Sequence, residues 1–187
     1  GIFESRILYV KIEGKRRNIG IMDFDGHSAV NLTNNDIVNI FPAFSDKSNV
    51  IWTSYQKGNP DIYRGSIYSG ASKLFIQSKG IESSPDVSPI DGTIAFASSR
   101  KGNLDVYTCN PDGSNVRQLT SHYGVDTSPS WSPNGYQIVF ISDRTGSPQL
   151  YIMDADGANQ RRISYSSKYV DSPAWSPKGD KIAFMSM

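Results

Sequence analysis

One short pattern recurs along this 187-residue chain and constrains its fold more than any other feature. A proline at the start of each copy recurs at spacings of 43, 44 and 44 residues, at Pro42, Pro85, Pro129 and Pro173. An aromatic column keeps a constant step of 44 residues and holds Trp52, Phe96, Phe140 and Phe184. Because these independent columns stay in phase, the sequence contains an internal repeat of about 44 residues.

Each repeat is predicted to form four short strands. The first is represented by "PSWS" and "PAWS", and the second by the apolar runs "QIVFIS" and "KIAFMS". The third, "QLYIMDADG", ends in an Asp-Gly turn, and the fourth is "RQLT" or "RRIS". Four-stranded repeats of about 40–45 residues are typical of propeller blades. We therefore predict an all-β fold, a β-propeller of four-stranded antiparallel blades.

The repeat boundaries predict one β-propeller domain over residues 1–187. Residues 1–40 supply the last three strands of a blade, and 41–83, 84–127 and 128–171 supply full blades. Residues 172–187 supply only the first two strands of another. About four blades are few for a propeller, so we expect part of a larger ring or a ring closed with another chain. Open blade edges and exposed interblade faces also predict self-association.

Two further columns predict how the blades are held together. The aromatic column is expected to form the core between blades, braced by Trp131 and Trp175. The pairs Ser99-Arg100 and Asp143-Arg144 recur one repeat apart. We expect them to fix the end of the second strand by ion pairs or hydrogen bonds.

The bulk composition excludes several classes of protein. The net charge of +1 gives no strong field that would favour nucleic acid as a partner. No apolar run approaches the roughly 18 residues that a membrane span needs. The single cysteine, Cys109, cannot form an internal disulfide.

No motif in the sequence predicts catalysis, a metal or a cofactor. There is no G-x-S-x-G elbow, no H-E-x-x-H and no C-x-x-C. The segments "DFDG" and "DADG" resemble the start of a calcium loop but lack the glutamate that such a loop needs. We therefore predict a protein that is not an enzyme and whose function is carried by a surface.

The loops that lead into the first strand of each blade are expected to line one mouth of the ring. These loops span residues 35–40, 79–83, 122–127 and 168–171. They carry polar Asp36, Glu82, His122, Asp126 and Asp171 beside apolar Ile81, Val125, Tyr169 and Val170. Carboxylates among apolar residues at a concave mouth favour a binding rim. Ordinary solvated loops remain the alternative.

The repeat also carries a family resemblance. The pattern "SP-x-W-SP-x-G-x-x-I-x-F-x-S-x-R-x-G" resembles the WD-like blade of TolB-type propellers. The opening "GIFESRILYV", followed by "MDFDG", resembles the segment where such a propeller begins. The resemblance implies a periplasmic, non-enzymatic partner of the Tol–Pal envelope system. It further implies a six-bladed ring that binds the peptidoglycan-associated lipoprotein Pal at one mouth, which colicin-type segments can exploit.

By motif match, the contact positions for that partner fall just before the proline of the first strand. They are Ile81, Glu82 and Ser83 in one blade, and Val125, Asp126 and Thr127 in the next. Members of the family also carry an N-terminal α/β domain, which this sequence does not contain. Two alternatives stay open. One is the gating propeller of a prolyl oligopeptidase-type serine peptidase, whose separate hydrolase domain would carry G-x-S-x-G, and the other is a generic scaffold propeller.

Overall fold

The computed structural model describes residues 5–165 and 168–187, and these residues form strands and turns with no helix. The first antiparallel sheet contains β1 (Arg6–Glu13), β2 (Arg16–Asp23) and β3 (Val30–Asn31). The second contains β4 (Asn39–Phe44), β5 (Asn49–Ser54), β6 (Asp61–Ser66) and β7 (Ser72–Ile76). The third contains β8 (Glu82–Val87), β9 (Ile94–Ser98), β10 (Asp105–Cys109) and β11 (Arg117–Gln118). The fourth contains β12 (Asp126–Trp131), β13 (Gln137–Ser142), β14 (Gln149–Asp154) and β15 (Arg161–Arg162), and the fifth β16 (Val170–Trp175) and β17 (Ile182–Ser186).

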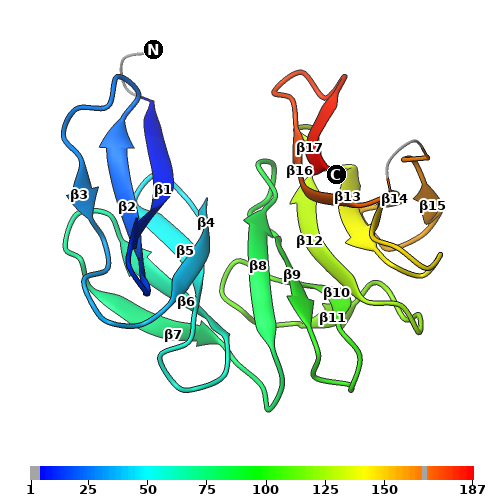
Figure 1. Cartoon of the computed structure of the whole chain (residues 1–187), viewed down its shortest axis with the longest axis horizontal. Coiled ribbons are helices and arrows are strands. Elements are labelled where there is room, and N and C mark those ends of the chain that lie inside the picture. The colour runs from blue at the N-terminus through cyan, green and yellow to red at the C-terminus, as the bar shows by residue number, and fades with distance from the viewer. Residues whose placement is uncertain (1–4, 166–167) are drawn as a thin grey trace.

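The sheets follow one another around an arc, from the blue N-terminal sheet to the red β16–β17 pair (Figure 1). Within each sheet, strands that follow one another in sequence pair antiparallel, so every sheet is a meander. Among the described strands, β1 and β17 belong to different sheets and no ladder joins the two ends of the arc. The all-β architecture of propeller blades is therefore confirmed.

The blade boundaries drawn from the sequence fall two residues too late. β4, β8, β12 and β16 begin at residues 39, 82, 126 and 170, whereas we expected blades to start at 41, 84, 128 and 172. The reason is that the residue-plus-proline pair lies within the first strand and forms a β-bulge. The register shifts between Thr127 and Ser130, and equivalent shifts occur in the other three first strands.

The residue before each bulge proline adopts a left-handed backbone conformation. Its φ is 51–52° in the four copies, at Phe41, Ser84, Ser128 and Ser172. A non-glycine residue there is unusual, and a bulge is one of the few places that requires it. Proline suits the next position because a bulged residue needs no ladder hydrogen bond. The four bulges line one hollow of about 300 Å³, which makes the first strand the innermost strand of each sheet.

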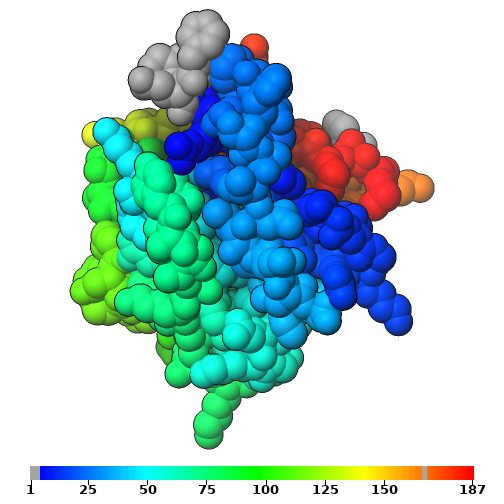
Figure 2. Space-filling model, turned by 90° about the vertical axis from the view of Figure 1, so that its left-hand side faces the viewer, coloured from blue at the N-terminus to red at the C-terminus, as the bar shows by residue number. Residues whose placement is uncertain are grey.

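The hydrophobic core lies between sheets, as the aromatic column predicted. Trp52, Phe96 and Phe140 are at most 2% exposed, and clusters combine residues of neighbouring sheets. Figure 2 shows the first sheet (blue) beside the second (cyan to green), where Ile19 packs with Val50 and Trp52. Phe184 departs from the prediction because it is 43% exposed on the two-stranded last sheet.

Candidate protein-binding mouth

A hollow of about 300 Å³ opens where the first strands begin. Phe41 comes from β4, Ser83 and Thr127 from β8 and β12, and Asp171 from β16, so four sheets contribute to its wall. Its lining is Phe41, Ser83, Ser84, Val125, Thr127, Ser128, Ile141, Asp143, Pro148, Tyr169 and Asp171. Apolar side chains with two carboxylates can hold a partner segment that presents an apolar side chain and a hydrogen-bond donor or cation.

The hollow brings together half of the residues singled out from the sequence. Ser83, Val125, Thr127 and Asp171 lie in its wall. Ile81 is 40% exposed but lies outside this lining, and so does the half-buried His122. The His122 ring packs against Tyr123, with 4.1 Å between the ring centroids.

Glu82 and Asp126 are not rim carboxylates, because both side chains are fully buried. Each is the first residue of its strand, and that strand packs against the arginine that follows the second strand of the same sheet. Arg100 Nη2 lies 3.3 Å from Glu82 Oε1, and Arg144 Nη2 lies 2.8 Å from Asp126 Oδ2. Their side chains therefore lie beneath the surface of the mouth.

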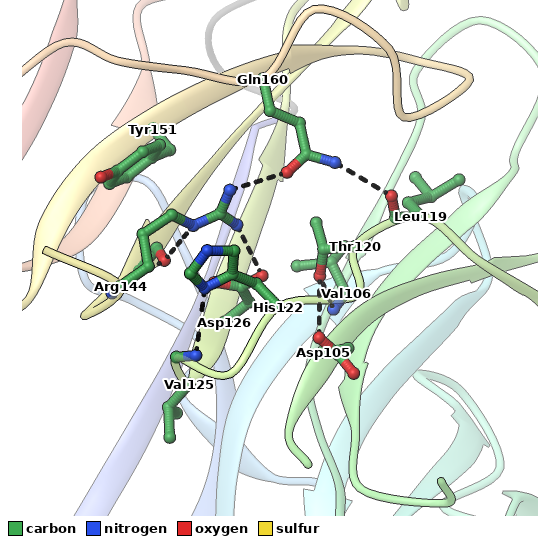
Figure 3. A network of polar contacts seen from close by, with 12 residues as sticks. Asp105, Val106, Leu119, Thr120, His122, Val125, Asp126, Arg144, Tyr151 and Gln160 are labelled. Carbon is green, nitrogen blue, oxygen red and sulfur yellow. Dashed lines mark hydrogen bonds and ion pairs between the residues drawn. The ribbon is translucent and has the colours of Figure 1, made fainter.

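Arg144 is the centre of the polar network drawn in Figure 3. Its Nε donates to Ser142 Oγ at 2.8 Å and its Nη1 to Gln160 Oε1 at 2.9 Å. The guanidinium also lies over the Tyr151 ring, 4.8 Å from its centroid. Arg100 repeats this arrangement with Ser98 and the Tyr107 ring. The predicted role of both arginines at the end of the second strand is thereby confirmed.

The residues before each arginine fix the backbone of the mouth. Asp143 Oδ1 accepts the Val125 amide at 2.7 Å, and Ser99 Oγ accepts the Ile81 amide at 2.8 Å. Asn103 Nδ2 donates to the carbonyls of His122 and Gly124, at 2.6 and 2.7 Å. These side-chain contacts pre-organise the loop that carries Val125, which lowers the entropy lost when a partner binds.

Asp105 lies next to this network (Figure 3), near enough to Asp126 for the two carboxyl groups to interact electrostatically. Burial raises the pKa of the Asp105 carboxyl, and the charge of Asp126 raises it further. Hydrogen bonds from the His122 amide, Gln118 and Thr120 oppose that rise in pKa. The blade junction therefore holds two buried carboxylates, one of which is neutralised by Arg144.

Sequence reasoning missed Phe41, Ile141, Asp143 and Pro148 as wall residues. For Phe41 a signal existed, because it stands in the column where the other three repeats have serine. Its side chain is 47% exposed, which is unusual for a phenylalanine on an inner strand. For the other three residues the signal was absent, since their side chains reach the hollow from other strands and turns.

Two features of the described residues concern metal binding and membrane spans. No group of three or more histidine, cysteine, aspartate or glutamate side chains converges there as a metal site. The same part of the chain contains no helix that is long and apolar enough to cross a membrane.

The family model for the TolB beta propeller domain matches residues 1–187. The chain belongs to this family. A TolB homolog from Chlorobaculum tepidum is 38% identical over 94 residues, which are 50% of this chain and 21% of that protein. A Tol-Pal system protein TolB from Desulfosudis oleivorans is 35% identical over 90 residues, 48% of this chain and 20% of that protein. The aligned half of the chain thus covers about a fifth of the length of these relatives.

Solved structures agree with this assignment. TolB from Acinetobacter baumannii superimposes with a TM-score of 0.87 and 28% identity, over 98% of this chain and 47% of that one. A puromycin hydrolase superimposes with a TM-score of 0.68 over 91% of this chain and 30% of that one. At 14% identity, the second match shows a shared propeller fold alone.

Proposed function

We propose that this TolB-type propeller is a non-enzymatic, periplasmic component of the Tol–Pal system that binds the lipoprotein Pal through the hollow at the starts of its first strands. The observation that carries the proposal is the hollow itself. Four sheets converge on it, and Val125, Tyr169 and Phe41 give it apolar walls beside the carboxylates of Asp143 and Asp171.

The chemistry of the hollow favours binding over catalysis. Its walls contain no histidine or cysteine that could act as a base or nucleophile. The likeness to puromycin hydrolases is one of fold, and no residue of the hollow favours a peptidase-gating role. Colicin-type segments would compete for the same walls, because they use the same mouth in the family.

Calorimetric titration with the soluble domain of Pal from the same organism tests the proposal. We expect saturable 1:1 binding to this chain and to the full gene product. Val125→Asp places a charge on the apolar wall and should weaken binding at least tenfold, as should Tyr169→Ala. Tyr136→Ala is the matched control, since Tyr136 is 74% exposed in the turn between β12 and β13, outside the hollow.

Two outcomes would contradict the proposal at different levels. If neither the chain nor the full gene product binds Pal, the assignment of the partner is wrong. If Pal binds but Val125→Asp and Tyr169→Ala bind as tightly as the wild type, the hollow is not the site.

A further inference from the structure

A hydroxyl group bridges the third and fourth strands in three of the four sheets that contain both. Thr33, Thr120 and Ser164 donate to the side chains of Asn18, Asp105 and Gln149, at 3.0, 3.4 and 2.7 Å. The same hydroxyl oxygens accept the amides of Ile19, Val106 and Leu150, at 2.8, 2.9 and 2.9 Å. The polar residue of the third strand is therefore satisfied from within its own sheet.

The sheet β4–β7 breaks this pattern at Asp61. The hydroxyl position is occupied by Ile76, which is paired with Ile62 in the β6–β7 ladder. Leu74 lies opposite Tyr63, where Gln118 lies opposite Tyr107 and donates to Asp105. Asp61 is 3% exposed, and its Oδ1 has no hydrogen-bond partner.

Two further buried oxygens without partners belong to the same junction. Ser54 lies directly opposite Asp61 in the β5–β6 ladder, so their side chains share one face, and Ser54 Oγ is unpartnered. The Glu82 amide donates to the Pro60 carbonyl at 2.8 Å, which places Glu82 beside Asp61, and Glu82 Oε2 is unpartnered. Burial raises the pKa of Asp61, and the nearby charge of Glu82 raises it further.

The charges around this junction leave it negative. Arg100 pairs with Glu82 through the other carboxylate oxygen, Oε1, and so offsets one of the two carboxylates. The positive charge of Lys57, at an exposed loop position, opposes the rise in the pKa of Asp61. Two buried carboxylate oxygens without a donor lie beside a buried serine hydroxyl without a partner, and this locally anionic site favours an electropositive group because unpaired buried polar atoms are costly.

We propose that Asp61, Glu82 and Ser54 bind a Ca²⁺ ion at the junction between the second and third sheets. Two carboxylates and a hydroxyl are hard oxygen ligands, and Ca²⁺ accepts irregular oxygen geometry with water in its remaining positions. Mg²⁺ fits less well, because it demands near-ideal octahedral geometry and gives up water reluctantly. The site joins two neighbouring blades, so the ion would tie the second sheet to the third.

Titration of chelator-treated protein with CaCl₂ tests this inference, by calorimetry and by thermal unfolding. We expect one binding equivalent and a rise in Tm that saturates with Ca²⁺, because a ligand that binds only the folded state stabilises it. MgCl₂ should act at least tenfold more weakly. Asp61→Asn and Ser54→Ala should each weaken Ca²⁺ binding at least tenfold.

Two variants distinguish a specific Ca²⁺ site from nonspecific attraction of Ca²⁺ to acidic residues. Asp105→Asn, at the neighbouring junction where Gln118 and Thr120 already donate to Asp105, should leave Ca²⁺ affinity unchanged. The double substitution Leu74→Gln and Ile76→Thr supplies the donors found in the third sheet and should weaken Ca²⁺ binding. Absence of any Ca²⁺-dependent heat or Tm shift would overturn the inference, and so would a shift that persists unchanged in Asp61→Asn.

Discussion

Arg144 Nη2 lies 2.8 Å from Asp126 Oδ2, and the Asp126 side chain is fully buried beneath the mouth. The same relationship recurs one repeat earlier between Arg100 and Glu82. In both copies the guanidinium also covers two aromatic rings of its own sheet, and the arginine side chains are only 21% and 13% exposed. A buried ion pair of this kind is sensitive to the loss of one partner, because the other charge then stays buried without compensation.

Removal of one partner should therefore destabilise the fold. Asp126→Ala is expected to lower the free energy of unfolding by about 3–5 kcal/mol, measured by urea denaturation. An exposed pair provides the control: Lys11 Nζ lies 2.9 Å from Glu13 Oε1 with both side chains in solvent, so Glu13→Ala should change the free energy by less than about 1 kcal/mol. If Asp126→Ala changes the free energy of unfolding as little as Glu13→Ala does, the Arg144–Asp126 ion pair does not stabilise the fold.

The two tryptophans of the first strands should differ in their contribution to stability. Trp131 is 7% exposed and packs with Phe140 and Tyr151, so Trp131→Ala should lower the unfolding free energy by about 3–5 kcal/mol. Trp175 is only half-buried on the two-stranded sheet, although its Nε1 donates to the Ser130 carbonyl at 3.2 Å. Trp175→Ala should lower it by about 1–2 kcal/mol. A larger loss for Trp175→Ala than for Trp131→Ala would contradict the deeper packing of Trp131.

The repeat predicted the sheets, the aromatic core and the two arginines, because those features depend on residue type at fixed spacing. It misplaced Glu82 and Asp126, because the strand starts two residues before the conspicuous serine–proline pair. Glu82 and Asp126 were therefore expected at the end of a loop, whereas they lie inside a β-ladder and are covered by the paired arginine side chains. Asp143 was assigned to an internal contact, and it also lines the hollow. Whether a residue with an internal contact also lines the hollow depends on how strands of different sheets approach one another. The spacing of residues within one repeat does not determine that approach.

The buried thiol of Cys109 should be inert in the folded protein. Burial raises the pKa of Cys109 to about 12, so the reactive thiolate is scarce at neutral pH. Reaction with a thiol reagent such as Ellman's reagent at pH 8 should be about 1,000-fold slower than in guanidinium-unfolded protein. Fast labelling without loss of the folded signal would show that the sheet β8–β11 opens locally around Cys109.

Asp86 should make stability depend on pH in a direction opposite to that of an ordinary surface carboxylate. It lines the inner hollow, and its Oδ2 accepts the Trp131 amide of the next sheet at 2.7 Å. Burial raises the pKa of Asp86 above 3.8, and hydrogen bonds from the Trp131 and Val87 amides and from Ser130 only partly oppose this. The folded state therefore binds the proton more tightly than the unfolded state. The stability that Asp86 contributes is full below its unfolded pKa and is lost as pH rises through the raised folded pKa.

Asparagine at this position keeps an acceptor for the Trp131 amide but does not titrate. Asp86→Asn should therefore become more stable relative to the wild type as pH rises from 4 to 8, measured by urea denaturation at each pH. Asp112 gives the opposite sign, because hydrogen bonds from the Ser114 side chain and amide lower its pKa. Asp112→Asn should become less stable relative to the wild type as pH rises towards the unfolded pKa of 3.8, from about pH 2 to 4, and the difference should then stay nearly constant up to pH 8. A difference between Asp86→Asn and the wild type that stays constant from pH 4 to 8 would show that the Asp86 carboxyl titrates alike in the folded and unfolded states.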